Sequence, residues 1–253
     1  MSEAVLEIRG VSKSFGALRA CDDISLEVRR GEVHALIGPN GAGKTTLIGQ
    51  ITGELAPDQG SIHFEGRDIT PLATAARARL GLARSFQITS IFRSFTAQGN
   101  VALAVQATEP HSFRFWHDVR RIGRLQNPAR RRLEEIGLAA RAGTVAAGMA
   151  HGEHRQLELA MALATEPTML LLDEPMAGLG SEESQAMLAL LGRLKGQYSI
   201  LLIEHDMDVV FSLADRVSVL VQGRVIASGA AEAIRNDPQV RVAYLGEDDD
   251  AEG

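Results

Sequence analysis

The sequence lacks the features that mark a protein for an oxidising compartment or for insertion into a membrane. Its 253 residues include one cysteine, Cys21, so no internal disulfide can form. The longest apolar runs, for example residues 169–172 and 217–221, are far shorter than the roughly 20 residues of a membrane-spanning helix. The first residues show no basic and apolar segments of the secretory kind. We therefore expect a soluble protein of the cytoplasm, with Cys21 as a small buried hydrophobe.

An excess of basic residues is also absent. The formal net charge is -6, which argues mildly against general binding to nucleic acid, whose phosphates favour a basic face. The chain is 45% hydrophobic and 23% charged, as is typical of soluble globular proteins. No internal repeat is present, and the acidic residues 247–250 predict a solvated, disordered end.

A glycine-rich turn is the most informative feature that the sequence does have. It follows an apolar run at 33–37 and precedes a helical pattern at 46–51, the strand, loop and helix order of a P-loop. The glycines let backbone N–H groups converge on phosphates, Lys44 is expected to reach the β- and γ-phosphates, and Thr45 is expected to bind Mg²⁺. The sequence thus predicts a site for a nucleoside triphosphate. The residues expected around it are Gly38, Pro39, Asn40, Gly41, Ala42, Gly43, Lys44, Thr45 and Thr46.

Two carboxylates follow the apolar run at 169–172. A buried strand would deliver Asp173 and Glu174 to the carboxyl edge of a sheet, where ligands of open α/β folds bind. We expect Asp173 to hold Mg²⁺ together with Thr45, and Glu174 to orient the attacking water. His205 follows another apolar run, at 200–203, and is expected to touch the γ-phosphate.

The order of elements predicts an α/β fold. Short strands are expected at 5–8, 24–28, 33–37 and 61–64, residues 71–163 are mostly helical in pattern, and strands and helices alternate from residue 169. Such alternation predicts a mostly parallel sheet with helices over it, joined to an N-terminal antiparallel β portion. We expect a single domain over residues 1–253, with a core at about 1–87 and 164–246, an inserted helical subdomain at about 88–163, and an acidic tail at 247–253.

These motifs, in this order, resemble the ATP-binding cassette (ABC) family of P-loop NTPases over nearly the whole chain. The resemblance assigns Phe15 to stacking on adenine, Gln87 to the Q-loop, which senses nucleotide and binds Mg²⁺, and His205 to the switch histidine. It gives catalytic roles to Lys44, Gln87, Glu174 and His205. The signature motif, which covers the ATP of a partner cassette, matches Met149, Ala150, His151, Gly152 and Glu153, and the D-loop matches residues 177–180.

Two positions depart from the usual family pattern. Ala150 replaces the signature serine, which removes one hydrogen bond to the partner's γ-phosphate, worth about 1.5 to 3 kcal/mol. Gly180 replaces the D-loop aspartate. The backbone N–H groups around Gly152 still offer an anion site at a helix start. We therefore expect a working ATPase that is slow as an isolated subunit.

Within the family, the chain resembles the ATPase subunit of high-affinity branched-chain amino acid importers most closely. Residues 84–93, 173–179 and 203–207 carry this resemblance, together with the ending at 226–246. It implies a peripheral protein on the cytoplasmic face of the inner membrane that binds ATP and Mg²⁺. Its expected partners are permease subunits, a second identical or related cassette and, indirectly, a periplasmic solute-binding protein, but no nucleic acid. The solute is a branched-chain amino acid or a related amide, urea or aromatic acid.

Other interpretations stay open. An exporter-type cassette, such as the lipopolysaccharide export ATPase, has a similar length, although the Q-loop and ending speak against it. A soluble ABC ATPase of translation or DNA repair normally has two cassettes or a long coiled coil, and this chain has neither a second P-loop nor sustained heptads. The aromatic and basic stretch at 108–132 is either a surface facing the permease or anionic lipid, or an ordinary helical subdomain.

Overall fold

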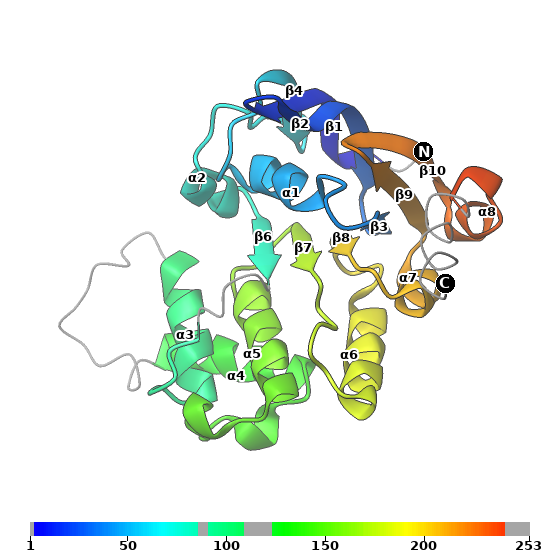
Figure 1. The fold of residues 1–253 in the computed structure, drawn as a ribbon. Coiled ribbons are helices and arrows are strands. Elements are labelled where there is room, and N and C mark those ends of the chain that lie inside the picture. Colours follow the sequence, from blue (N-terminus) through cyan, green and yellow to red (C-terminus); the bar gives the residue numbers. More distant parts are fainter. Residues whose placement is uncertain (1–2, 86–90, 109–122, 241–253) are drawn as a thin grey trace. The chain divides into compact units, whose positions relative to one another are not determined.

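The computed structural model describes residues 3–85, 91–108 and 123–240. Contacts within the chain group it into two compact units, Met1–Ala78 with Leu194–Gly253 and Arg79–Arg193. Each unit is described by itself, with the element labels of Figure 1. In the described ranges no helix is both long enough and apolar enough to cross a membrane. Gln87 and most of the stretch at 108–132 lie outside the described residues.

An antiparallel sheet opens the first unit, in the strand order β2-β1-β4-β5. Its strands are β1 (Ala4–Phe15), β2 (Leu18–Arg29), β4 (Gln59–Phe64) and β5 (Arg67–Asp68). A tight turn at Gly16, with φ of 60°, joins β1 to β2 and brings Phe15 opposite Leu18. The predicted N-terminal β portion is thus present, with longer strands than the apolar runs alone predicted.

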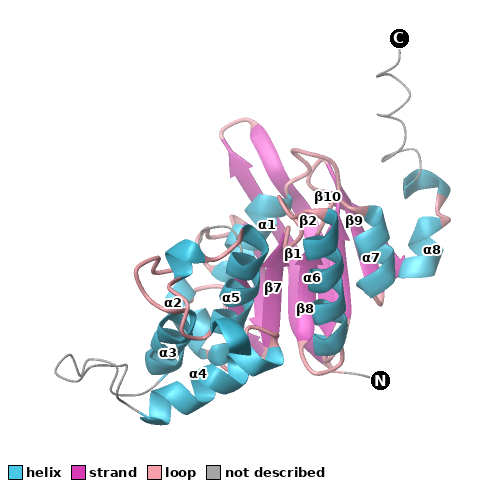
Figure 2. Ribbon diagram, turned by 90° about the horizontal axis from the view of Figure 1, so that it is seen from below, coloured by secondary structure: helices cyan, strands magenta, loops and turns pink. Residues whose placement is uncertain are grey.

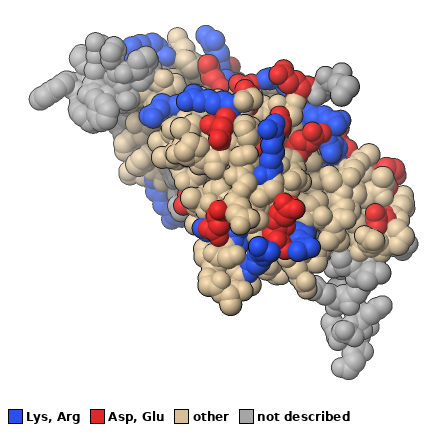
Figure 3. Space-filling view, turned by 90° about the horizontal axis from the view of Figure 1, so that it is seen from above, with Lys and Arg blue, Asp and Glu red and all other residues tan. Residues whose placement is uncertain are grey.

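Ion pairs bind neighbouring parts of this sheet at its surface. Within strands, Arg9 pairs with Glu7 and Arg29 with Glu27. Lys13 reaches the Asp58 carboxylate at 2.7 Å, and Arg216 also pairs with Glu27. Figure 3 shows acidic and basic side chains interspersed on the face in view, with no large area of one sign.

Four strands of the first unit form the order β10-β9-β3-β8. Every residue of β3 (Val33–Ile37) and β8 (Ser199–Ile203) is buried, and both neighbours of β3 run parallel to it. Uniform burial is typical of parallel strands covered on both faces. β9 (Arg216–Val221) turns through Gln222 and Gly223, which both have positive φ, into the antiparallel β10 (Arg224–Ala230). The strand predicted at 33–37 is confirmed, and the apolar runs at 200–203 and 217–221 form strands that each begin one residue earlier.

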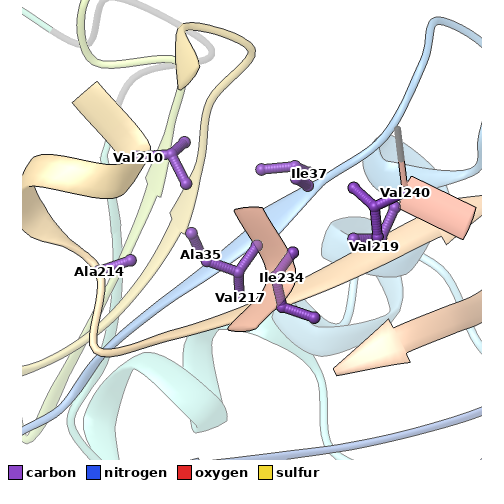
Figure 4. Packing of buried hydrophobic residues seen from close by; sticks show 8 residues of the cluster. All are labelled: Ala35, Ile37, Val210, Ala214, Val217, Val219, Ile234 and Val240. Carbon is purple, nitrogen blue, oxygen red and sulfur yellow. The ribbon is translucent and has the colours of Figure 1, made fainter. Parts of the chain in front are cut away.

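Two short helices pack against these strands. α7 (Met207–Leu213) starts at Asp206, whose carboxylate accepts hydrogen bonds from the N–H groups of Asp208 and Val209. α8 is Ala231–Arg235. Figure 4 shows the apolar cluster that joins both helices to β3 and β9. Its members are Ala35, Ile37, Val210, Ala214, Val217, Val219, Ile234 and Val240.

The helix after β3 is fixed at its C-terminal end by a buried arginine. α1 (Lys44–Thr52) ends at Gly53, and α2 (Thr74–Arg79) supplies Arg77, which is 2% exposed. The Arg77 guanidinium donates to carbonyl oxygens of the last α1 turn and of the segment before α2. These acceptors are the carbonyls of Gln50 (2.6 Å), Ile51 (2.7 Å), Thr70 (3.0 Å) and Leu72 (2.9 Å). A positive charge thus lies at the negative end of the helix dipole, while burial lowers the pKa of Arg77.

The second unit combines two parallel strands with helices. β6 (Leu82–Ser85) pairs in parallel with β7 (Met169–Asp173). Figures 1 and 2 show the helices of this unit, which are α3 (Ala97–Thr108), α4 (Gly123–Glu135), α5 (His151–Ala164) and α6 (Ser181–Leu194). Short 3-10 helices at Ala139–Arg141 and Ala146–Gly148 precede α5. The expectation that 71–163 is mostly helical missed β6, because its four residues include the polar Arg84 and Ser85.

The boundaries of the second compact unit differ from those of the predicted helical subdomain. The helices α3 and α4 pack on each other and on α5, as an inserted helical subdomain requires. The second unit also includes β6, β7 and most of α6, which the sequence assigned to the core. The subdomain boundaries at about 88–163 therefore stay a prediction.

The buried arginine gives a test of how the fold holds α1. Arg77→Met should lower the free energy of unfolding by about 3 kcal/mol, because it leaves four carbonyl groups without their donor. Arg79→Met, on the exposed side of the same helix, should change it by less than about 0.5 kcal/mol. Urea unfolding followed by circular dichroism measures both. Equal stability of the two variants would contradict this role.

Candidate nucleotide-binding site

The turn between β3 and α1 has a backbone that only glycine can follow. A Cβ on Gly38 would meet the Leu220 carbonyl oxygen, and a Cβ on Gly43 would meet that of Ala20, in both cases at less than van der Waals distance. Gly43 also has φ of 106°, in the left-handed region. It starts α1 with no hydrogen bond from a side chain to the first N–H groups. This turn is a cradle of backbone N–H groups at a helix start, which is suited to a phosphate.

Lys44 and the threonines stand at the start of the same helix. The Lys44 ammonium donates to the carbonyl oxygens of Gly38 and, at 3.0 Å, Pro39, so it lies over the turn. Thr45 is exposed and Thr46 is partly buried. A positive charge and an exposed hydroxyl thus stand beside the N–H groups of the turn. This arrangement supplies the groups that the sequence assigned to phosphates and Mg²⁺.

Two neighbouring parts of the first unit support the turn: the buried Cys21, and the hairpin between β9 and β10. Cys21 is buried, receives a hydrogen bond from Gln50 at 3.2 Å, and has its Sγ 4.0 Å from the Gly43 carbonyl oxygen. Burial raises the pKa of the Cys21 thiol, which fits a packing role and no reactive one. Laterally, the Gly223 N–H donates to the Ala42 carbonyl at 2.9 Å. The hairpin between β9 and β10 therefore holds the P-loop in place.

Phe15 ends β1 with a ring that is available to a ligand. It is 48% exposed, which is high for a large apolar side chain. The Lys13 ammonium lies 5.8 Å from the ring centroid and also pairs with Asp58. An exposed aromatic ring can stack on a flat base. The adenine contact of Phe15 stays a prediction.

His205 follows β8 and is anchored by its neighbour. Its side chain is 66% exposed, and its Nδ1 lies 3.9 Å from Oε2 of the buried Glu204. The His205 N–H also donates to that carboxylate at 3.2 Å. The imidazole therefore stands at the carboxyl end of a parallel strand, as predicted, with its backbone fixed and its ring exposed.

A second histidine of the first unit forms a buried polar chain. His34 Nε2 lies 2.8 Å from Ser218 Oγ, which lies 2.8 Å from Ser228 Oγ, and His34 Nδ1 is 3.4 Å from Glu32 Oε1. The series of acid, imidazole and hydroxyl has the elements of a hydrolytic triad. His34 and Ser218 are, however, fully buried between strands, so no substrate reaches them. This series of buried polar side chains links β3, β9 and β10.

In the second unit, β7 ends on the two predicted carboxylates. Asp173 is buried and receives a hydrogen bond from Arg84 on the neighbouring strand β6, at 3.2 Å. Glu174 is partly exposed and has φ of 50°, which is uncommon for a residue with a side chain. Such backbone strain tends to occur at functional sites. The turn thus places two consecutive acids in different surroundings, since Asp173 is buried and Glu174 is partly exposed.

The signature residues form the first turn of α5. Ala150 precedes the helix, and its N–H donates to the Glu153 carboxylate at 2.9 Å. Arg141 pairs with the same carboxylate at 2.7 Å. Partial burial would raise the pKa of Glu153, but the Ala150 N–H and Arg141 outweigh it and lower that pKa. Met149 and Gly152 are buried, whereas Ala150 and His151 are exposed.

A carboxylate from α6 joins the signature to the D-loop. Glu183 accepts hydrogen bonds from the Gly152 N–H and the Gly180 N–H, both at 3.1 Å. His151 packs on the D-loop too, since a Cβ on Gly178 would lie 3.2 Å from its ring nitrogen. The signature helix start therefore already holds an anionic group, which supports its reading as an anion site.

Sequence reasoning missed Arg84 and Glu183. Glu183 could have been found from its spacing, because an acid three residues after a helix start, here Gly180, is typical of a capping box. Its second contact, with Gly152, joins segments about 30 residues apart and has no local signal. Arg84 lies in β6, a strand too short to predict. Gln87, the predicted Q-loop glutamine, lies outside the described residues.

Comparisons with known proteins agree with this assembly of parts. The family model described as ABC transporter matches residues 21–177, and one described as branched-chain amino acid ATP-binding cassette transporter matches residues 224–250. The chain is 40% identical to the high-affinity branched-chain amino acid transport ATP-binding protein LivG of Salmonella typhimurium, over 98% of this chain and 100% of LivG. It is 38% identical to BraF of Pseudomonas aeruginosa, a protein of the same description, over the same shares.

Solved structures show the same similarity. The ADP conformation of MJ1267, an ATP-binding cassette of an ABC transporter, superposes with a TM-score of 0.86 and 30% identity, covering 97% of this chain and 100% of MJ1267. A nucleotide-free cassette from an ABC transporter superposes with a TM-score of 0.85 and 31% identity, covering 96% and 99%. The expected P-loop fold is thereby confirmed.

The contact between Gly152 and Glu183 gives a test of the signature geometry. A Cβ on Gly152 would lie 2.7 Å from Glu183 Oε1, so Gly152→Ala should expel that carboxylate and lower the free energy of unfolding by about 1 kcal/mol. Gly148→Ala, where a Cβ meets open space, is the matched control. In a Glu183→Ala background the cost of Gly152→Ala should vanish. An equal cost in both backgrounds, measured by urea unfolding, would show that the contact is not formed.

Proposed function

Since this chain belongs to the ABC transporter family and is an ATPase coupled to transport, we propose that it powers the import of branched-chain amino acids. The observation that carries the proposal is the combination of a P-loop cradle with near full-length similarity to LivG and BraF. The match of the ending at 224–250 to the branched-chain amino acid model adds support. An exporter-type role is less well supported, because these matches extend over the whole chain.

We propose that the first unit binds the nucleotide. The N–H groups at residues 41–46 and the Lys44 ammonium would hold the phosphates, and Phe15 would stack on the base. The shape of the turn depends on Gly38 and Gly43, because they bring its backbone closer to the Leu220 and Ala20 carbonyls than any other residue allows. Purine stacking alone does not select ATP over GTP, so the preference for ATP rests on the family.

Magnesium fits the oxygen donors that the chain offers. The Thr45 hydroxyl and the Asp173 carboxylate are hard ligands of the kind Mg²⁺ prefers, and Mg²⁺ usually keeps several waters and phosphate oxygens besides. We propose these two residues, with Gln87, as the groups that hold it. When bound, the metal would neutralise charge on the transferred phosphoryl group.

Hydrolysis needs a group that orients the attacking water. We propose Glu174 for it, because its carboxylate follows a buried strand, is partly exposed, and lies on a backbone held at a positive φ. His205 would contact the γ-phosphate from the end of β8. The base, the water and the γ-phosphate would thus meet Phe15, Glu174 and His205, which end or follow strands, as in other open α/β folds.

A second cassette would complete the site. The start of α5 would cover the ATP of the partner with its N–H groups, since Ala150 lacks the usual hydroxyl. Binding of two ATP molecules closes such a dimer and hydrolysis reopens it, which moves attached permease subunits. We place the protein on the cytoplasmic face of the inner membrane, with permease subunits, a same or related cassette, and indirectly a periplasmic solute-binding protein as partners.

The assignment of Glu174 is tested by hydrolysis. In the purified chain, Glu174→Gln should lower the kcat for Mg²⁺-dependent ATP hydrolysis at least about 100-fold, because the water loses its base, while ATP affinity stays within about threefold. Glu166→Gln, at another surface residue with positive φ, should leave both values unchanged. Phosphate release and isothermal titration measure the two quantities. Full activity of Glu174→Gln would exclude Glu174 as this group.

Transport needs a separate test, because the cassette does not select the solute. In cells that produce this chain, the Glu174→Gln variant should abolish uptake of radiolabelled leucine, isoleucine and valine, while uptake of an unrelated sugar continues. If uptake of all three amino acids is unchanged although the purified variant has lost hydrolysis, the assignment as an ATPase stands. The proposed solute class is then wrong.

A further inference from the structure

Two neighbouring strands of the second unit bring an arginine to the candidate metal ligand. In the parallel register of β6 and β7, Arg84 lies beside Leu171. Asp173 is two residues further along β7 and therefore lies on the same face of the strand pair. An Nη2 atom of Arg84 donates to Asp173 Oδ2 at 3.2 Å. The two residues form a diagonal ion pair across the strands.

This ion pair is largely removed from water, unlike most ion pairs between the residues that the structure describes. The side chains of Arg84 and Asp173 are only 15% and 9% exposed. Within the same unit, Arg130 and Glu134 pair on the open surface of α4. A buried carboxylate needs a compensating positive charge, and an arginine stays protonated at all ordinary pH values. Arg84 supplies this compensation.

We infer that Arg84 is an internal counter-cation for Asp173 and that its charge sets how tightly the site holds Mg²⁺. The inference rests on the proposed role of Asp173 as a metal ligand. A guanidinium beside the carboxylate both satisfies one of its oxygens and repels a second cation nearby. Asp173 thus stays ordered before the metal binds, and it binds the metal less tightly than an uncompensated carboxylate would. Arg84 acts through Asp173 and is a positioning residue.

The first test compares ADP binding with and without the metal. Isothermal titration gives the dissociation constant of ADP in excess Mg²⁺ and in EDTA. The constant in EDTA divided by the constant in Mg²⁺ reports how much the metal contributes to ADP binding. Arg84→Gln, which keeps a donor but loses the charge, should enlarge this ratio at least about tenfold over wild type. Its ADP affinity in EDTA should stay within about twofold. Arg84→Lys, which keeps the charge, should resemble wild type.

Arg132→Gln is the matched control for loss of an arginine charge. Arg132 is 23% exposed and pairs at 2.8 Å with Glu135, which has no proposed role in the site. The ratio of ADP dissociation constants of Arg132→Gln should equal that of wild type. Arg84→Met, with an apolar chain of similar length, gives a second neutral variant should Arg84→Gln not fold.

Thermal unfolding provides a measurement independent of nucleotide affinity. Without nucleotide, Arg84→Gln should lower the Tm by about 5 °C, because Asp173 loses its compensation. Addition of ADP with Mg²⁺ should raise the Tm of this variant more than that of wild type. ADP with EDTA should raise both equally.

The outcomes separate this inference from the proposed function. Asp173→Asn should remove the effect of Mg²⁺ on ADP binding. If it does not, the metal assignment fails, and the inference fails with it. If Asp173→Asn behaves as expected but both neutral Arg84 variants keep the wild-type ratio or lower it, Asp173 is the ligand and Arg84 has no such role.

Discussion

The close approach of backbone to backbone at the P-loop is the constraint on which the rest of the structure depends. Gly38 and Gly43 lie so near the Leu220 and Ala20 carbonyls that no side chain fits at either position. The loop is therefore formed by packing between β3, β2 and the hairpin of β9 and β10, before any ligand binds. Arg77 fixes the opposite end of α1 through four carbonyl groups. A helix held at both ends presents its first N–H groups in a fixed direction, as an anion site requires.

Charge compensation within the chain is the second theme. Three groups that are expected to meet phosphate or metal have an internal partner of suitable charge or polarity. Carbonyl oxygens receive Lys44, Arg84 pairs with Asp173, and the Glu183 carboxylate accepts the N–H of Gly152. These contacts keep charged groups ordered and satisfied in the absence of ligand. Binding then exchanges one set of partners for another, which limits the net change in free energy.

How much the sequence revealed depended on how local the signal was. The runs at 33–37, 169–172 and 200–203 predicted strands correctly, because short and mostly apolar segments report burial on both faces. β6 and β10 were missed, since β6 is short and polar at its end and the second half of β10, residues 227–230, consists of the small residues Ala, Ser, Gly and Ala. The P-loop, Asp173, Glu174 and His205 follow local motifs. Arg84 beside Asp173 and Glu183 beside Gly152 depend on register and packing between distant segments, which no local pattern encodes.

The central claim is that the backbone of the P-loop, closely packed at glycines, binds the nucleotide. Calorimetric titration of ATP into wild type and Gly43→Ala tests it most directly, with circular dichroism to verify the fold. The account predicts micromolar binding by wild type and binding at least about tenfold weaker in the variant, because a Cβ must move the turn away from Ala20. Equal affinity of the two folded proteins would contradict it.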